Sequence, residues 1–324
     1  MILSGKAIAH PAVHGSQTIS TPLFQEPIAN WQDWGRVFQS IPAFSPLARE
    51  ICRREGLPWC PLSPLTPGTN GVFRCGELVL KIFFPKESGL DPEPDFRTET
   101  AACSQAAAWG VPTPQPVAQG VLRDKYVFHY LVTAYSPGEE AGDWLAAASP
   151  VQQERLVEQL KELLSRLNRP ASGLLPDRDL GQEAEENPRL QKLPPRLRGD
   201  LLTRLETLDL GNPVLVHGDL TGENLLVGEN SGLTVIDWAD AHLAPAWYEL
   251  GPLAFELFRG NGRLWQLFAG EHREEFLERL LDCLCLHDFG PDFLVQWAQR
   301  LGRVPFASLE EVREQLEVTF DGET

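Results

Sequence analysis

The sequence lacks any hydrophobic run that approaches the roughly 20 consecutive apolar residues needed to span a bilayer. Its first residues, Met-Ile-Leu-Ser-Gly-Lys, do not lead into the apolar stretch and small-residue cleavage site of a secretory signal. Both absences favour a cytoplasmic protein that does not enter a membrane. At 324 residues the chain is too long for one small core, so two domains or lobes are expected.

Cysteine is scarce, and the six cysteines show no disulfide framework. Cys283 and Cys285 stand close to His287 and could suggest half of a zinc site. No second ligand pair follows at zinc-site spacing, and the surrounding run is apolar. We therefore predict that these two pack in the core, as do the scattered cysteines. The scattered four are Cys52, Cys60, Cys75 and Cys103.

Positive charge is scarce too, because 28 Lys and Arg residues stand against 45 Asp and Glu residues, a formal net charge of −17. A general nucleic-acid binder presents a basic surface, so this charge argues strongly against that class. An acidic cleft would concentrate a cationic substrate. An acidic surface also simply keeps a protein in solution, so charge alone leaves both interpretations open.

The first part of the chain predicts little regular structure. Residues 1 to about 28 are small, polar or Pro and show no periodicity, which indicates an irregular arm. Apolar residues then recur at helical spacing over 31–38 and again over 46–55, so two short helices are expected. We assign residues 1–58 to this arm and its helices.

The rest of the chain predicts two lobes of different character. Residues 59–136 alternate apolar runs with tight turns, such as Asn70-Gly71, and contain one helix near 95–109. Residues 137–324 are mostly helical by periodicity. A sheet-rich nucleotide-binding N-lobe and a larger helical C-lobe are therefore expected. Short strands interrupt the helical part near 214–216, 224–227 and 234–236.

Three oxygen-bearing side chains surround two of these short strands. The chain reads Val-Leu-Val-His-Gly-Asp up to Asp219, Asn224 follows five residues later, and the next strand ends at Asp237. This order brings the three side chains to one end of a small hairpin. Phosphoryl transfer uses such a set, with one carboxylate to orient the attacking hydroxyl and hard oxygen ligands for Mg²⁺. Each residue alone would pass as a cap or turn residue, but the combination is far more specific.

With this motif the sequence resembles the aminoglycoside-phosphotransferase family, relatives of choline kinases and, more distantly, of protein kinases. The resemblance implies an α+β, bilobal, protein-kinase-like fold with a small antiparallel sheet in the N-lobe. It implies that Asp219 accepts the proton of the substrate hydroxyl or orients it, and that Asn224 and Asp237 bind Mg²⁺. His217 would support the loop by hydrogen bonds, and Glu249 stands where the family usually has Asp at a helix start.

A second set in the first half of the chain fits the same resemblance. Lys81 is the only charge in the apolar run at 78–84, where an unpaired ammonium would be costly. Glu99 lies on the following predicted helix, eleven residues before Gly110 and its Val-Pro-Thr-Pro sequel, a spacing that matches the family. By resemblance, Lys81 binds the nucleotide phosphates and Glu99 holds Lys81. A lysine that reaches solvent from an edge strand is the alternative.

Two further segments are assigned by resemblance. The turn Thr-Pro-Gly-Thr-Asn-Gly at 66–71 would cover the phosphates, with Thr69 and Asn70 near the nucleotide, although alone it would pass as any hairpin. The segment 130–138 resembles the hinge between the lobes. There the Ala134 carbonyl and the Ser136 N–H would face the base, and Tyr135 would point away. An ordinary strand end is the alternative.

The resemblance implies a kinase that transfers the γ-phosphoryl group of ATP or GTP, with Mg²⁺, to a small, amine-bearing acceptor such as an aminoglycoside. A kinase of a metabolite, such as choline, a sugar or an amino-alcohol, is the alternative on the same fold. A protein kinase is disfavoured because Asp237 lacks the following Phe-Gly and no activation segment closed by Ala-Pro-Glu follows. A non-catalytic nucleotide-binding module would not need the lysine, the glutamate and the downstream triplet together.

Overall fold

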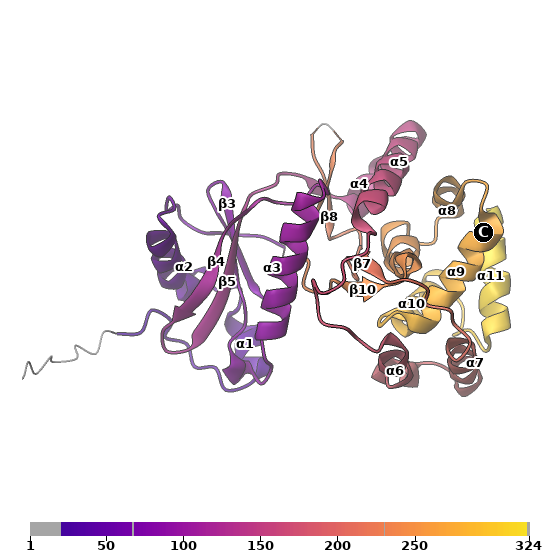
Figure 1. Cartoon of the computed structure of the whole chain (residues 1–324), viewed down its shortest axis with the longest axis horizontal. Coiled ribbons are helices and arrows are strands. Elements are labelled where there is room, and N and C mark those ends of the chain that lie inside the picture. Colours follow the sequence, from indigo (N-terminus) through magenta and orange to yellow (C-terminus); the bar gives the residue numbers. More distant parts are fainter. Residues whose placement is uncertain (1–20, 67, 230, 323–324) are drawn as a thin grey trace, which may run out of the picture.

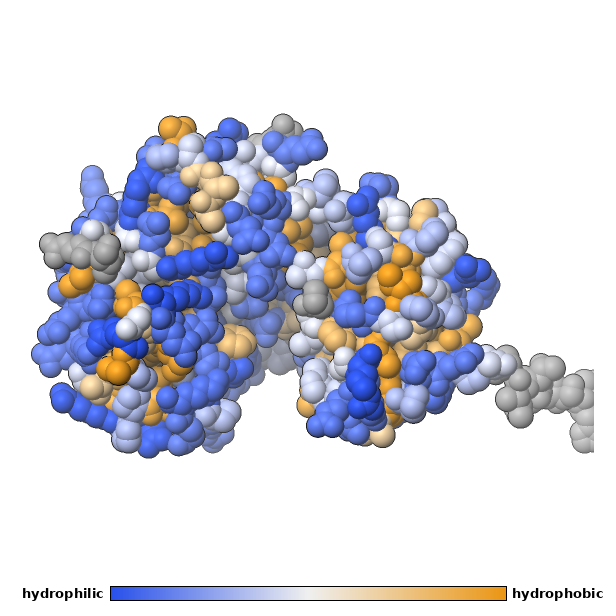
Figure 2. Space-filling model, turned by 180° about the vertical axis from the view of Figure 1, so that it is seen from behind, coloured by the Kyte–Doolittle hydropathy of each residue, from blue (hydrophilic) through white to orange (hydrophobic). Residues whose placement is uncertain are grey.

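The computed structural model describes residues 21–66, 68–229 and 231–322. Within them the chain forms two lobes that lie side by side, one containing a sheet and one mostly helical (Figure 1). The predicted α+β, bilobal fold is therefore confirmed. Seen from behind, both lobes have a largely hydrophilic surface with a hollow between them (Figure 2). Of the irregular arm expected over residues 1 to about 28, residues 1–20 fall outside the described residues, and residues 21–28 contain neither helix nor strand.

The N-terminal lobe is built on a five-stranded antiparallel sheet with the order β1-β2-β3-β5-β4. Helix α3 lies on the face that looks toward the C-terminal lobe, and α1 and α2 pack on the opposite face (Figure 1). The elements are α1 (Trp31–Val37), α2 (Ile41–Glu55), β1 (Ser63–Pro64), β2 (Gly71–Cys75), β3 (Leu78–Ile82), the 3₁₀ turn η1 (Lys86–Ser88), α3 (Glu93–Ala108), β4 (Pro116–Arg123) and β5 (Val127–Ala134).

The pleat of β3 divides its side chains between two environments. Leu80 and Ile82 are fully buried in the core shared with α1 and α2. Val79 and Lys81 point to the other face, toward α3 and the second lobe. This alternation is the period of two expected for a strand buried on both faces. It explains how a lysine sits in an apolar run without entering the apolar core.

Helix α2 begins five residues earlier than the periodicity predicts. Ser40 caps it, since its Oγ accepts a hydrogen bond from the N–H of Ala43 at 3.4 Å. Pro42 fits the first turn, where a backbone N–H has no helical partner. The capping residue and this proline were the overlooked signals of the helix start.

The C-terminal lobe packs its helices around a core that includes Phe255, Trp265 and Trp297. None of the helices in the described part of the chain is both long and apolar enough to cross a membrane. The helical elements are α4 (Ala141–Ala147), α5 (Pro150–Leu167), α6 (Leu180–Glu185), η2 (Pro188–Lys192), α7 (Pro195–Leu205), η3 (Ala246–Glu249), the π-helical turn η4 (Pro252–Leu257), α8 (Gly262–Ala269), α9 (Arg273–Leu286), α10 (Gly290–Arg300) and α11 (Leu309–Asp321).

The C-terminal lobe also contains two small sheets. β6 (Glu139–Glu140), β8 (Leu225–Val227) and β9 (Leu233–Val235) form one sheet in the order β6-β8-β9. β7 (Val214–Val216) and β10 (His242–Ala244) form the other. The strand β10 was not predicted from the sequence. The two sheets fix the polar turns that follow β7 and β9 at the boundary between the lobes.

Cysteines pack in both cores. Five of the six are buried, and Cys60 is half-buried. The Sγ of Cys283 lies 3.1 Å from the carbonyl oxygen of Tyr248, to which it donates a hydrogen bond. In the described ranges no group of three or more His, Cys, Asp or Glu side chains is arranged to hold a metal ion.

Candidate active site

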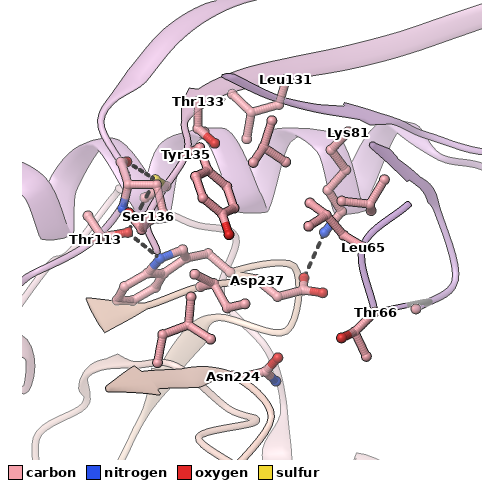
Figure 3. Close-up of a pocket in the computed structure, with 18 of the residues that line it drawn as sticks. Leu65, Thr66, Lys81, Thr113, Leu131, Thr133, Tyr135, Ser136, Asn224 and Asp237 are labelled. Carbon is pink, nitrogen blue, oxygen red and sulfur yellow. Dashed lines mark hydrogen bonds and ion pairs between the residues drawn. The ribbon is translucent and has the colours of Figure 1, made fainter. Parts of the chain in front are cut away.

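A cavity of about 280 Å³ lies between the lobes (Figure 3). Its apolar part is formed by Val79 from β3, Leu131 from β5 and Leu226 from β8. Its polar end carries Lys81, Glu99, Asn224 and Asp237. An apolar slot with charged groups at one end suits a molecule that joins a flat ring to an anionic chain.

Lys81 binds two carboxylates at once. Its Nζ lies 2.7 Å from Oε2 of Glu99, on α3, and 2.7 Å from Oδ1 of Asp237, in the second lobe. Lys81 is 8% exposed and Glu99 5%. Burial alone would lower the pKa of Lys81, but Asp237 and Glu99 together raise it above its ordinary value. Lys81 is therefore a buried, charged and paired ammonium, and not a side chain that reaches solvent.

The pKa values of Glu99 and Asp237, the two carboxylates that pair with Lys81, are shifted in opposite directions. Burial raises the pKa of Glu99 to about 7, against the attraction of Lys81. Burial acts on Asp237 in the same direction, but Lys81 holds the pKa of Asp237 below its ordinary value. Asp237 is therefore ionised at neutral pH. A carboxylate that stays ionised while half-exposed to a cavity is available to a cation.

The backbone at Asp237 is held in an unusual conformation. Asp237 has a φ of +60°, the left-handed region that few residues other than Gly, Asn and Asp adopt. On either side it is fixed by the segment after α3. Val235 donates its N–H to the Pro112 carbonyl at 2.8 Å, and the Trp238 indole donates to Oγ1 of Thr113 at 2.9 Å. The Gly-Val-Pro-Thr-Pro run thus docks the first lobe onto the strand that presents Asp237.

Asp219 and Asn224 are joined within one loop. Nδ2 of Asn224 donates to the backbone oxygen and to Oδ2 of Asp219, both at 2.8 Å. This leaves Oδ1 of Asn224 as an acceptor for a cation. Burial raises the pKa of Asp219 to about 7, and the neighbouring carboxylates Asp240 and Asp237 add to the effect.

His217 supports this loop from beneath. Its Nδ1 accepts the N–H of Asp219 at 3.3 Å, so Nε2 carries the proton and donates to the Ile236 carbonyl at 3.0 Å. Burial lowers the pKa of His217 to about 4, which keeps the ring neutral. One imidazole thus connects the backbones beside Asp219 and Asp237.

Gly218 brings the same two segments into direct contact. It has a φ of +82°, and a Cβ there would lie 2.3 Å from the backbone oxygen of Asp240. Any side chain at this position would force the loop away from the segment after Asp237. The glycine of the His-Gly-Asp motif is therefore required by a close backbone approach.

A family comparison agrees with this geometry. The model of the phosphotransferase enzyme family, APH, matches residues 68–297, which span both lobes and all the groups above. The chain belongs to this phosphotransferase family. No curated protein sequence gives a significant match to this chain.

Solved structures share the fold of this phosphotransferase. The GDP complex of aminoglycoside 2′-phosphotransferase-IIIa has a TM-score of 0.57 at 19% identity, and the match covers 86% of this chain and 98% of that one. The complex of a related enzyme with GDP and kanamycin has a TM-score of 0.58 at 17% identity, with 86% and 98% covered. APH(4)-Ia with ADP and hygromycin B has a TM-score of 0.55 at 14% identity, with 84% and 97% covered. At these identities the likeness shows the fold of small-molecule kinases.

Most of the predicted site residues of the phosphotransferase lie together. Six of the nine line the cavity, and Asp219 lies beside it, bound to Asn224. Thr69 and Asn70 are not among the residues that line it. Tyr135, predicted to point away from the base, lines the cavity instead, and Cζ of Arg74 stacks 3.7 Å from its ring centre. The six lining residues are Lys81, Glu99, Ala134, Ser136, Asn224 and Asp237.

Two glutamates have contacts that the sequence did not predict. Glu249 is 1% exposed, and its Oε1 accepts the backbone N–H of His217, so it anchors the loop of Asp219. Burial raises the pKa of Glu249 to about 7. Glu140 lies at the mouth of the cavity, where its Oε1 accepts a hydrogen bond from Oγ1 of Thr66 at 2.9 Å. The signal for Glu249 was a lone carboxylate in the apolar run Trp-Tyr-Glu-Leu.

The raised pKa of Asp219 predicts a pH dependence. Below about pH 7 this carboxyl becomes protonated and can no longer accept a proton from a hydroxyl. We expect kcat/KM for the acceptor to fall by about tenfold per pH unit well below that value. Glu249→Gln is the control, because Glu249 titrates in the same range while Gln keeps the oxygen that accepts the His217 N–H. Loss of the acid limb in Glu249→Gln would contradict its assignment to Asp219.

Proposed function

We propose that this phosphotransferase transfers the γ-phosphoryl group of ATP or GTP, with Mg²⁺, to a hydroxyl of a small molecule that carries protonated amines. The observation that carries the proposal is the meeting of Lys81, Asp237 and Asn224 at one end of an interlobe cavity, with Asp219 beside them. Phosphoryl transfer depends on positioning and charge stabilisation more than on covalent chemistry, and this set provides both. Solved structures of this fold hold GDP in two complexes, ADP in a third and ATP in a fourth.

Each group has a role that follows from its contacts. Lys81 supplies a fixed positive charge for the phosphates, and Glu99 keeps its ammonium in place. Asp237 and Oδ1 of Asn224 are hard oxygen donors of the type that hold Mg²⁺, which would neutralise phosphate charge there. The base would occupy the apolar part of the cavity, with its edge toward Ala134 and Ser136.

Asp219 acts on the acceptor. Its carboxylate is half-buried and held by Asn224, so it can orient a hydroxyl and accept the proton as the oxygen attacks phosphorus. Because it lies beside the cavity rather than in its lining, it leaves the nucleotide space free. The acceptor hydroxyl would therefore lie between Asp219 and the phosphate end of the cavity.

The charge around Asp219 supports an amine-bearing acceptor. Asp240 is exposed three residues after Asp237, and Asp95 on α3 is half-buried. The surrounding protein keeps part of the solvent from the carboxyls of Asp240 and Asp95, which raises the pKa of each, and the nearby Asp237 raises both further. A cationic acceptor would relieve this repulsion, and the chain as a whole is at −17. Proteins of this fold have been solved with kanamycin and with hygromycin B.

A nucleotide-consumption screen tests the proposal. Purified protein would be given ATP or GTP, with or without Mg²⁺, and a panel of aminoglycosides, amino-alcohols and neutral sugars. We expect consumption only with Mg²⁺ and an amine-bearing acceptor, with an acceptor KM that rises as salt is raised across the physiological range. Phosphorylation of neutral sugars alone, with a salt-independent KM, would contradict the amine-bearing acceptor. No consumption with any acceptor and no nucleotide binding would contradict the phosphotransferase activity.

A further inference from the structure

Helix α1 holds the back of the turn at 66–71, although it precedes the residues that the family model matches. The indole Nε1–H of Trp34 donates to the backbone oxygen of Thr69 at 2.8 Å. The side-chain amide of Gln39, two residues beyond the end of α1, donates to the backbone oxygen of Asn70 at 3.4 Å. Two successive carbonyls of the turn are therefore bound by the N-terminal segment.

Asn70 and Gly71 complete this attachment. Asn70 is 3% exposed, and its Oδ1 accepts the N–H of Phe84 at 3.2 Å. A Cβ at Gly71 would lie 3.1 Å from the Phe38 carbonyl oxygen and 3.2 Å from the ring of Phe44. The backbone of the turn thus packs directly on α1 and α2. Asn70, predicted to contact the nucleotide, has a side chain that is engaged in holding the turn.

Two residues from the first half of the turn, Thr66 and Gly68, face the cavity instead. Thr66 lines the cavity (Figure 3), as does Gly68. Oγ1 of Thr66 donates a hydrogen bond to Oε1 of Glu140 at 2.9 Å. Gly68 is bonded directly to Thr69, whose carbonyl Trp34 holds. A shift of the anchored half would therefore move the half that faces the cavity. Backbone N–H groups in such a turn approach phosphates, so a displacement of a few tenths of an ångström alters their hydrogen bonds.

We propose that Trp34 is a positioning residue of the nucleotide site, which sets the place of the phosphate-covering turn through its hydrogen bond to Thr69. The proposal rests on the proposed function, because it takes the nucleotide as the occupant of the cavity. Trp34 is 1% exposed, and its ring packs edge-on against Phe44 with the centroids 5.8 Å apart. The indole is thus fixed in the one orientation that reaches the turn. This assigns part of the nucleotide site to a helix outside the matched family region.

Trp34→Phe tests this, because it keeps an aromatic ring while it removes the indole N–H; the ring volume lost with the N–H is matched by the control below. We expect the nucleotide Kd and KM to rise about threefold to tenfold, the range that the loss of one neutral hydrogen bond gives. The kcat should stay within about twofold and the acceptor KM should not change, since the loss acts on nucleotide binding. Hydrogen exchange in the nucleotide-free protein should be faster at the backbone amides of 68–71.

Trp265→Phe is the matched control. Trp265 is fully buried in the C-terminal lobe, and its Nε1–H also donates to one backbone oxygen, that of Ala254, at 3.2 Å. Trp265→Phe should lower the melting temperature about as much as Trp34→Phe does, without a change in the nucleotide Kd. Equal weakening of nucleotide binding in both variants, or none in Trp34→Phe, would overturn the inference. A wild-type protein that binds neither ATP nor GTP would instead overturn the proposed function, and the wild-type titration alone shows this.

Discussion

Asp219→Asn should lower kcat by about two to four orders of magnitude, the usual contribution of a positioned general base. The nucleotide Kd should stay within about twofold, since Asp219 does not line the nucleotide cavity. Asn has the same shape, and its side-chain oxygen can still accept the hydrogen bond from Nδ2 of Asn224. The loop should therefore keep its conformation while the proton acceptor is lost. Steady-state turnover and a nucleotide titration measure the two quantities separately.

This result would also separate general-base action from a purely structural role. A structural carboxylate would lower the melting temperature and turnover together, whereas the loss of a base lowers turnover at an unchanged melting temperature. The smallest expected loss of kcat is about 100-fold. A loss of less than about tenfold would contradict the assignment of Asp219 as the general base.

Asp237→Asn is expected to weaken binding of the Mg²⁺-nucleotide by about 100-fold or more. Loss of an outer-shell partner of a metal already weakens its binding by about 10–100-fold, and Asp237 is proposed as a direct ligand. Asn is preferred to Ala because residue 237 has a φ of +60°, which Asn tolerates better. The substitution also leaves Lys81 with one carboxylate partner, Glu99, instead of two. Titration of nucleotide at several Mg²⁺ concentrations measures the effect.

The two substitutions serve as controls for each other. Both remove one negative charge from carboxylates that face the same region, and both keep the side-chain shape. Asp237→Asn should act on nucleotide affinity and Asp219→Asn on turnover. Equal losses of nucleotide affinity in the two variants would mean that the roles assigned to them are wrong.

Much of the fold could be predicted because its signals are local. The alternation of apolar residues and the amphipathic helix over 151–168 predicted elements that the structure contains. The tight turn predicted at Asn70-Gly71 is wrong, because Gly71 is the first residue of β2 and pairs with Ile82. The strand β10 was missed because three residues, His-Leu-Ala, show no period of their own. They form a strand only because β7, far away in sequence, supplies the hydrogen-bond partners. The start of α2 was missed for the lesser reason that its cap was overlooked.

The site, too, contains residues that the sequence pattern indicated and contacts that it did not. Lys81 and Glu99 could be paired in advance, because a charge in an apolar strand needs a partner and the following helix offered one. The contacts of Trp34 with Thr69 and of Glu249 with His217 join segments more than thirty residues apart. Nothing in either segment alone indicates its partner. Such contacts depend on how distant segments pack together inside each lobe, which the sequence pattern does not encode residue by residue.

The short connection between Asp237 and β10 has a consequence for regulation. Only residues 238–241 separate them, and the backbone oxygen of Asp240 already rests on Gly218. Kinases that are switched by phosphorylation use a long segment at this point, which orders when its new charge meets arginines. Here the strand pair β7–β10 closes the connection at once, so both aspartates are in place without a prior signal. We therefore expect activity that needs no ordering step at this connection and that follows the supply of nucleotide and acceptor.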